Sequence, residues 1–253
     1  MKKLISVFLL SIVAPLTAVA SGSGYHLDDM KPNVSNKASL QRGAQTFVNY
    51  CMGCHEMQYS RYERVADDLE IPHELMVENL IFNDSKIGQL MTNAMTVDAA
   101  KRWFGAAPPD LTLVARVRGE DWLYTYLRTF YEDSTRPLGV NNEVFPNVGM
   151  PHVLMELQGL QKKGCAQVAV DIDVLTGQDI TEERCDVLYL AEEGSQSPAE
   201  YEETVYDLVN FLVYTAEPMQ QERVRIGIIV MLFLVVLFIC AYLLNREYWK
   251  DIH

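Results

Sequence analysis

An uninterrupted apolar segment near the C-terminal end places the strongest constraint on how this chain can fold. Residues 226–244 carry no charged side chain, and fourteen of these 19 residues are Leu, Ile, Val or Phe. A helix that rises about 1.5 Å per residue would extend this segment over roughly 28 Å, the thickness of the hydrocarbon layer of a bilayer. A helix packed in a soluble core usually keeps a polar face, and this segment has none. We therefore predict a transmembrane anchor over residues 223–245 and a short cytoplasmic tail over residues 246–253.

The N-terminal residues are typical of a cleaved secretory signal peptide. Residues 1–20 open with two lysines soon followed by an apolar run, and they end with alanines at positions −3 and −1 relative to Ser21. The apolar run has 11 residues, which is too short to span a bilayer. We expect this signal to send residues 21–222 across the membrane and the apolar segment to stop the transfer. The chain is thus predicted to be a single-pass protein of the bacterial inner membrane with a periplasmic domain.

The chain is acidic, with 21 Lys and Arg against 34 Asp and Glu and a net charge of −13. The phosphates of a nucleic acid would repel such a protein, so the charge argues against a nucleic-acid partner. It favours a basic protein partner, although acidity also serves plain solubility. Three pairs of adjacent glutamates would attract a basic partner or belong simply to solvated surfaces: Glu182 with Glu183, Glu192 with Glu193, and Glu202 with Glu203.

The pattern of apolar residues predicts a mainly α fold with long loop insertions. Apolar residues recur at helical spacing from Ser39, which stands at a capping position, and this helix leads directly into Cys51. Further helices are expected over residues 74–81, 97–104, 122–131 and 199–215. Residues 137–151 are rich in Pro, Gly and Asn and show little periodicity, and residues 168–175 are a weak candidate for a hairpin.

The segment CMGCH at residues 51–55 carries the clearest chemical signal. Two thiols separated by two residues and followed by histidine are the pattern that attaches a c-type haem covalently, with the histidine beneath the iron. A zinc site would need a second ligand pair at suitable spacing, which Cys165 and Cys185 do not provide. A thioredoxin-like pair would follow a strand, whereas an amphipathic helix precedes this segment. We therefore predict one haem c bound covalently by Cys51 and Cys54, with His55 as an axial ligand.

The sixth iron ligand separates electron transfer from other haem functions. A methionine closes the iron and raises its potential, whereas an open site permits gas sensing or peroxide chemistry. Met150 is the leading candidate, because it lies in the rigid, non-helical segment PNVGMP at residues 146–151. The residues alone leave Met91, Met95, His73 and His152 open as candidates. Met76 and Met155 stand at helical spacing, which favours a place in the core for both.

Two further cysteines, Cys165 and Cys185, are 20 residues apart in a compartment that permits disulfides. A bridge between them would stabilise a poorly patterned segment by roughly 3 kcal/mol in the chain-entropy model. Two free, buried thiols are the alternative.

Two longer stretches resemble a known family. Residues 102–111 read RWFGAAPPDL and are followed by RVR at 116–118, and residues 209–218 read VNFLVYTAEP before the single apolar segment. Together with CMGCH they resemble the cytochrome c1 family over essentially the whole mature chain. The resemblance implies a c-type cytochrome core and the haem c subunit of the quinol–cytochrome c oxidoreductase, the cytochrome bc1 complex. This subunit is not a catalyst by itself.

The resemblance also implies partners and site residues. The implied partners are a cytochrome b subunit, a Rieske iron–sulfur protein as electron donor and a basic c-type cytochrome as acceptor, in a dimeric complex. Met150 is implied as the sixth ligand, Pro109 as a residue packed near the haem edge, and Arg118 as the partner of a haem propionate. A solvated surface charge is the alternative for Arg118.

The surroundings of the implied ligand are of the bacterial kind. Mitochondrial members carry the ligand methionine between alanines, whereas this chain reads Gly149-Met150-Pro151, as bacterial relatives do. The pair Cys165 and Cys185 likewise resembles a disulfide of bacterial members.

Two rival functions remain at this point. One is an anchored monohaem cytochrome c of another respiratory enzyme, against which residues 102–110 and the size of the domain speak. The other is a haem sensor or peroxidase with an open sixth site, which would bind carbon monoxide rapidly when reduced.

Overall fold

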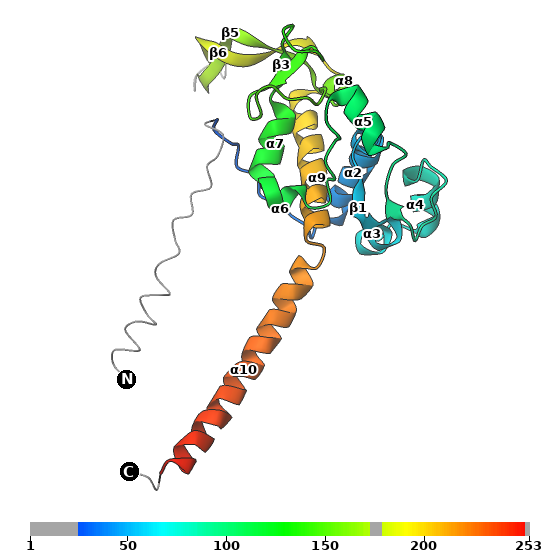
Figure 1. Ribbon diagram of the computed structural model, residues 1–253. Coiled ribbons are helices and arrows are strands. Elements are labelled where there is room, and N and C mark those ends of the chain that lie inside the picture. Colours follow the sequence, from blue (N-terminus) through cyan, green and yellow to red (C-terminus); the bar gives the residue numbers. More distant parts are fainter. Residues whose placement is uncertain (1–24, 173–178, 251–253) are drawn as a thin grey trace.

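The computed structural model describes residues 25–172 and 179–250. The predicted signal peptide, residues 1–20, lies outside the described residues. Figure 1 shows a globular part of short helices around a long central helix, α9, and a second long helix, α10, that extends away from it. In chain order the helices are α2 (Lys37–Thr46), the π-helix η1 (Phe47–Cys51), α3 (Tyr62–Leu69), α4 (His73–Leu80), α5 (Val97–Phe104), α6 (Val114–Arg118), α7 (Glu120–Arg128), α8 (Met155–Gln158), α9 (Pro198–Ala216) and α10 (Gln220–Tyr248).

Helices α2 and α9 cross in close contact at the centre of the globular part. A Cβ atom on Gly43 of α2 would collide with the main-chain carbonyl of Asp207 in α9, so only glycine permits this approach. Beyond the crossing, the rings of Phe47 and Phe211 lie 5.9 Å apart between centroids, and both are fully buried. The packing of α2 against α9 therefore fixes where η1 delivers the chain to Cys51.

Side-chain caps begin both of these helices. The side chain of Asn36 accepts a hydrogen bond from the main-chain N–H of Ser39 at 3.2 Å, so Asn36 is the N-cap of α2. The expectation that Ser39 caps this helix is wrong, because Ser39 lies within the first turn and its hydroxyl accepts a bond from Asn210 of α9. Helix α9 begins with a capping box, in which Ser197 and Glu200 bond each other's main-chain N–H groups.

The shorter predicted helices are largely confirmed. Helix α4 covers nearly all of residues 74–81, α5 coincides with residues 97–104, and α9 extends the predicted 199–215 by one residue at each end. Helix α7 ends three residues before the predicted boundary at residue 131. The reason is tertiary, because the residues from Phe130 onward leave the helix to pair with a later strand.

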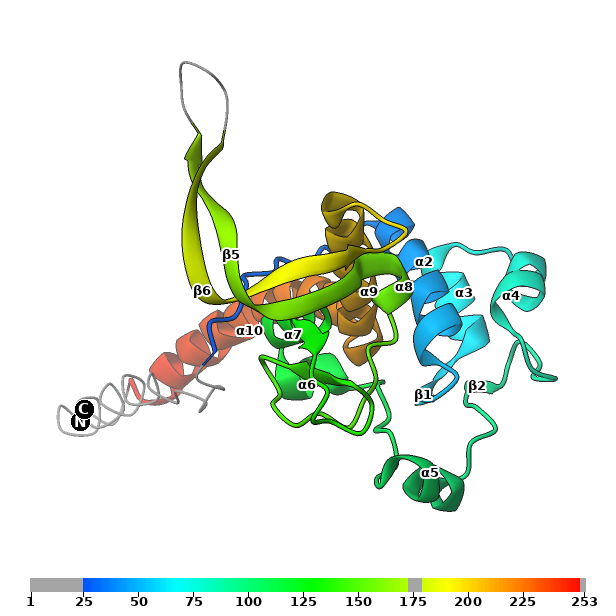
Figure 2. The same ribbon diagram turned by 90° about the horizontal axis from the view of Figure 1, so that it is seen from above.

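The strands of the described residues form two-stranded antiparallel sheets. The pairs are β1 (Met57–Arg61) with β2 (Leu90–Met91), β3 (Phe130–Glu132) with β4 (Val140–Asn142), and β5 (Gly159–Ile172) with β6 (Asp179–Glu193). The first two pairs are short and hold loops against the helices. The third is a long hairpin that projects from the globular part (Figure 2).

This hairpin corrects the sequence-based fold prediction in two ways. Its strands have 14 and 15 residues, so it is much longer than the weak hairpin expected over residues 168–175. The class "mainly α" is therefore only partly right. The base of the hairpin is anchored by the side-chain amide of Gln161, which donates to the carbonyls of Arg128 at 2.8 Å and Phe130 at 2.9 Å.

Helix α10 contains the predicted membrane anchor. It is 29 residues long, its most apolar window has a mean hydropathy of 3.1, and none of that window is buried against the rest of the protein. Among the described residues it is the one helix that is long and apolar enough to cross a bilayer. Its large apolar side chains are exposed, and Leu232, Phe233 and Phe238 are more than half exposed, which suits a surface that faces lipid.

Candidate functional site

The segment CMGCH begins at the last residue of η1, Cys51, and forms a tight turn. The main-chain N–H of Cys54 donates to the carbonyl of Cys51 at 3.1 Å, and that of His55 donates to the same carbonyl at 2.8 Å. The turn brings Cys51, Cys54 and His55 to the wall of one cavity. Burial raises the pKa of the Cys51 thiol to about 12, which favours the protonated thiol at neutral pH.

His55 is oriented by the segment that follows α5. Its Nδ1 lies 2.7 Å from the carbonyl oxygen of Pro109, which can only accept a hydrogen bond. Nδ1 therefore carries the proton, and Nε2 keeps a free lone pair. Burial lowers the pKa of His55, which favours this neutral form. A histidine held in this way is suited to bind a metal through Nε2.

Main-chain contacts hold Pro109 beside His55. Gly105 ends α5 with a φ of +80°, a backbone conformation that favours glycine, and the chain then runs along the cavity. The N–H of Leu111 donates to the carbonyl of Glu56 at 2.8 Å, and the carboxylate of Asp110 accepts from the N–H of Gln58 at 2.7 Å. These bonds join Asp110 and Leu111, at the end of the stretch RWFGAAPPDL, to the residues just after His55.

The cavity that these residues border has a volume of about 250 Å³. Apart from the two thiols and the imidazole, its wall consists mainly of aliphatic and aromatic side chains. The lining residues are Tyr50, Cys51, Cys54, His55, Phe104, Ala106, Ala107, Pro108, Pro109, Phe145, Gly149, Met150, Pro151 and Val153. Pro109, which the family resemblance implies as a residue packed near the haem edge, is part of this wall.

Met150 is the methionine among the lining residues. It lies in an irregular segment that is fastened to the protein by two asparagines missed in the sequence analysis. The buried side chain of Asn142 donates to the Tyr126 carbonyl at 2.7 Å and accepts from the N–H groups of Val144 at 2.9 Å and Phe145 at 3.1 Å. Asn141 Oδ1 accepts from the N–H of Asn147 at 2.8 Å. These bonds hold the loop that carries Met150 against α7.

The other candidate ligands lie elsewhere. Met76 and Met91 are buried in the core, and Met155 is exposed at the start of α8. Met95 borders a different cavity, on the far side of Met52 and Gly53. His73 bonds the carboxylate of Asp67 at 2.8 Å, and the buried His152 stacks on Phe130 with 4.9 Å between ring centroids. Of the candidates that the sequence left open, the structure brings Met150 to the cavity with His55.

Arg118 lies beside the cavity rather than in its wall. Its guanidinium stacks over Trp122 and Phe145, with 4.9 Å and 5.6 Å between the guanidinium carbon and the ring centroids. Phe145 itself lines the cavity. Within residues 25–172 and 179–250, Arg118 forms no ion pair with a carboxylate. The side chain is thus held by aromatic rings at the rim, with its charge not neutralised by the protein.

The donor set and the wall together fit a haem c. Two thiols, an imidazole whose Nε2 is free, and a thioether border one apolar cavity. The profile of the Cytochrome C1 family matches residues 84–252. The chain belongs to the cytochrome c1 family. The family implies a haem c cofactor and an electron-transfer role in the respiratory bc1 complex, in which cytochrome c1 is a redox subunit without catalytic activity of its own.

Two full-length relatives carry different names. A cytochrome c1 from Allochromatium vinosum is 52% identical over 254 residues and covers 100% of both chains. The ammonia monooxygenase gamma subunit of Nitrosomonas europaea is 41% identical and covers 99% of this chain and 100% of that protein. Among solved structures, a chain of a hyperthermophilic respiratory complex III matches 100% of this chain and 95% of its own length, with 17% sequence identity and a TM-score of 0.47.

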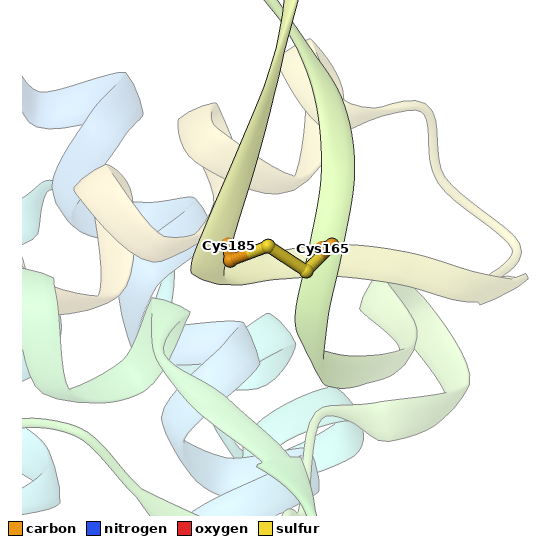
Figure 3. Close-up of a disulfide and its surroundings, with 2 residues drawn as sticks. All are labelled: Cys165 and Cys185. Carbon is orange, nitrogen blue, oxygen red and sulfur yellow. A yellow bond between two sulfur atoms is a disulfide. The ribbon is translucent and has the colours of Figure 1, made fainter.

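The hairpin of this cytochrome c1 family member carries two further cysteines. The structure joins Cys165 of β5 and Cys185 of β6 in a disulfide that links the two strands (Figure 3). No hairpin residue within 159–172 or 179–193 lines the cavity described above. The bridge therefore braces the hairpin and does not contribute to the site.

Sequence reasoning missed several residues that shape the site. Asn141, Asn142, Asp110 and Tyr126 hold or contact the segments that carry Met150 and Pro109. The adjacent asparagines in a stretch rich in Pro and Gly were a usable signal, because asparagine side chains often bond the main chain of loops. Nothing in the sequence alone connects Tyr126 with Met150.

Proposed function

We propose that this chain is the subunit of a bacterial quinol–cytochrome c oxidoreductase that carries one electron from a Rieske iron–sulfur protein to a c-type cytochrome. One observation carries the proposal. His55, with a free Nε2, and the Met150 thioether border the same apolar cavity as the paired thiols. When bound, a single haem c supplies one-electron redox chemistry at this cavity.

The residues have distinct roles in this proposal. Cys51 and Cys54 would hold the haem covalently through their thiols, and His55 and Met150 would bind its iron. The Pro109 carbonyl keeps His55 in the tautomer that binds iron, and the ring of Pro109 packs at the haem edge. With both residues bound to the iron, small molecules would be excluded, and the site would suit electron relay rather than gas sensing or peroxide chemistry.

Arg118 is proposed to neutralise a haem propionate. Its guanidinium, held over Trp122 and Phe145, lacks a carboxylate partner among the described residues and lies next to the cavity wall. A charge-assisted hydrogen bond to a propionate would supply that partner.

The proposed topology is that of a single-pass inner-membrane protein. Residues 1–20 act as the cleaved signal, residues 21–222 form the periplasmic haem domain, residues 223–245 are the anchor and residues 246–253 the cytoplasmic tail. The unburied apolar surface of α10 supports the anchor. In this arrangement the cavity faces the compartment in which a soluble c-type cytochrome would meet it.

The proposed partners are a cytochrome b subunit, the Rieske protein, a basic c-type cytochrome and a second copy of the complex. The net charge of −13 supports a basic acceptor. The acidic pairs contribute unequally, because Glu202 pairs with Arg128 and Glu203 with Arg42, and none of the six glutamates lines the cavity. The attraction is therefore one of overall charge.

The ligation is tested by the absorption spectrum of the oxidised, haem-loaded full-length protein. We expect the weak near-infrared band of sulfur-to-iron charge transfer in the wild type and its loss in Met150→Leu. Met155→Leu is the matched control, because Met155 is exposed and lies away from the cavity. If the wild type lacks the band, or Met150→Leu keeps it, Met150 is not the ligand and the relay mechanism fails.

A second candidate function is favoured by the 41% identical relative named as an ammonia monooxygenase subunit. In that case the chain would be an anchored cytochrome of another respiratory enzyme with the same haem ligation. Gentle detergent purification of the native complex distinguishes the two. Co-purification of cytochrome b with quinol–cytochrome c reductase activity supports the bc1 assignment, and its absence from the intact complex argues for the alternative.

A further inference from the structure

Tyr126 contacts Met150 without lining the cavity itself. Its hydroxyl donates a hydrogen bond to the Met150 sulfur, with 3.3 Å between oxygen and sulfur. Met150 lines the cavity, whereas Tyr126 does not. The thioether thus borders the candidate haem site and also accepts a bond from a hydroxyl that lies outside the lining of that site.

The ring of Tyr126 is held in place, so its hydroxyl is aimed before any cofactor arrives. Only 8% of the residue is exposed. The ring stacks on Trp122, one turn earlier in α7, with 4.8 Å between centroids and 12° between planes, and it meets Phe130 edge-on at 5.1 Å. The main-chain carbonyl of Tyr126 also accepts the bond from Asn142, which anchors the Met150 loop. Ring and loop are thus fixed relative to each other.

The Tyr126 hydroxyl is a neutral donor throughout the physiological range, because a phenol ordinarily keeps its proton up to about pH 10. The hydroxyl stays protonated and has few alternative partners in its buried site. Its hydrogen bond to the sulfur is therefore stable. Thioether sulfur is a weak acceptor with two lone pairs, so one pair can accept this bond while the other faces the cavity.

We propose that Tyr126 is a positioning residue that holds the Met150 thioether and raises the reduction potential of the bound haem. This inference rests on the proposed ligation by Met150. A hydrogen bond draws electron density from the sulfur and so weakens its donation to iron. Oxidised iron depends on that donation more than reduced iron does, so the bond favours the reduced state. Removal of the hydroxyl should therefore lower the potential.

The test compares Tyr126→Phe with Tyr124→Phe in the haem-loaded full-length protein. Both variants remove one hydroxyl from α7, but Tyr124 instead carries the guanidinium of Arg128 on its ring, at 4.5 Å. The loss of one hydrogen bond changes an equilibrium constant by about three- to tenfold. For Tyr126→Phe the equilibrium constant for reduction by a fixed one-electron couple should fall about three- to tenfold, roughly 30–60 mV at 59 mV per tenfold change. Tyr124→Phe should match the wild type within twofold.

The outcomes separate this inference from the proposed function. If the wild type shows the near-infrared sulfur band and Tyr126→Phe keeps both the band and the wild-type potential, Tyr126 has no influence and this inference alone is wrong. If the wild type lacks the band, Met150 is not a ligand and both proposals fail. A lowered potential with the band retained supports the inference.

A second measurement covers the case in which Tyr126→Phe does not fold. Site-specific 3-fluorotyrosine at position 126 keeps the ring and the hydroxyl but makes the hydroxyl a stronger donor. The potential should then rise relative to the wild type, opposite in sign to the effect of phenylalanine. An unchanged or lower potential in this folded, haem-loaded protein would overturn the inference.

Discussion

Replacement of Asn142 by alanine should loosen the loop that carries Met150. Asn142 is fully buried, and its amide makes three hydrogen bonds that join the Tyr126 carbonyl in α7 to the N–H groups of Val144 and Phe145. Each bond contributes about 1 kcal/mol net, and a buried partner left without a bond costs about 1–3 kcal/mol. Allowing for partial rehydration of the three orphaned groups, we expect Asn142→Ala to lower the free energy of unfolding by about 3–5 kcal/mol.

The assay is urea unfolding of the haem-loaded full-length protein in detergent, followed by the haem absorption and by the near-infrared sulfur band. A loop that opens more often should also let the reduced protein bind carbon monoxide faster than the wild type does. Asn79→Ala is the control, because its exposed side chain makes one bond, to the Leu75 carbonyl within α4. This control should change the unfolding free energy by less than about 0.5 kcal/mol. A loss below about 1 kcal/mol for Asn142→Ala, with carbon monoxide excluded as in the wild type, would refute the role assigned to Asn142.

Three further outcomes are expected. Gly43→Ala should destabilise the protein by about 1–3 kcal/mol in thermal unfolding, because the new methyl group meets the Asp207 carbonyl. Gly88→Ala is the control and should not destabilise it, because the nearest atom to its new methyl group is 3.5 Å away. Equal stability of the two variants would contradict the close helix crossing. Replacement of Cys165 and Cys185 by serine should lower the unfolding free energy by about 3 kcal/mol and leave the haem spectrum unchanged. If intact-mass analysis of the alkylated wild type finds free thiols at these two positions, the bridge is contradicted. The rate of electron transfer to a basic cytochrome should fall as ionic strength rises, because salt screens the attraction exerted by a chain with net charge −13. A rate that does not depend on salt would remove this attraction from the mechanism.

Two parts of the molecule can be read from short stretches of sequence. The turn at residues 51–55 is closed by bonds within five residues, and the chemistry of its thiols and imidazole depends on their spacing along the chain. The apolar segment inside α10 predicts a membrane helix, because its environment is set by its own composition and not by a partner element. The helices α4, α5 and α9 are likewise visible as local periodicity.

The length of the hairpin formed by β5 and β6 cannot be predicted from local sequence patterns. Most of its residues are exposed on both faces, so its strands lack the alternation of apolar and polar residues that marks a half-buried strand. It is held by main-chain pairing, by the bridge between Cys165 and Cys185, and by the bonds of Gln161 to the end of α7. These contacts connect segments that no local pattern relates.

The sequence by itself determined the thiol pair, its histidine, the membrane helix and the family resemblance, because each depends on residues close together in the chain. Only the tertiary structure decided how His55 is oriented and which hydroxyl contacts Met150. The Pro109 carbonyl is 54 residues from His55, and the Tyr126 hydroxyl is 24 residues from Met150. Such contacts exist only after the helices pack, since it is the packing around α2 and α9 that brings these distant segments to one cavity.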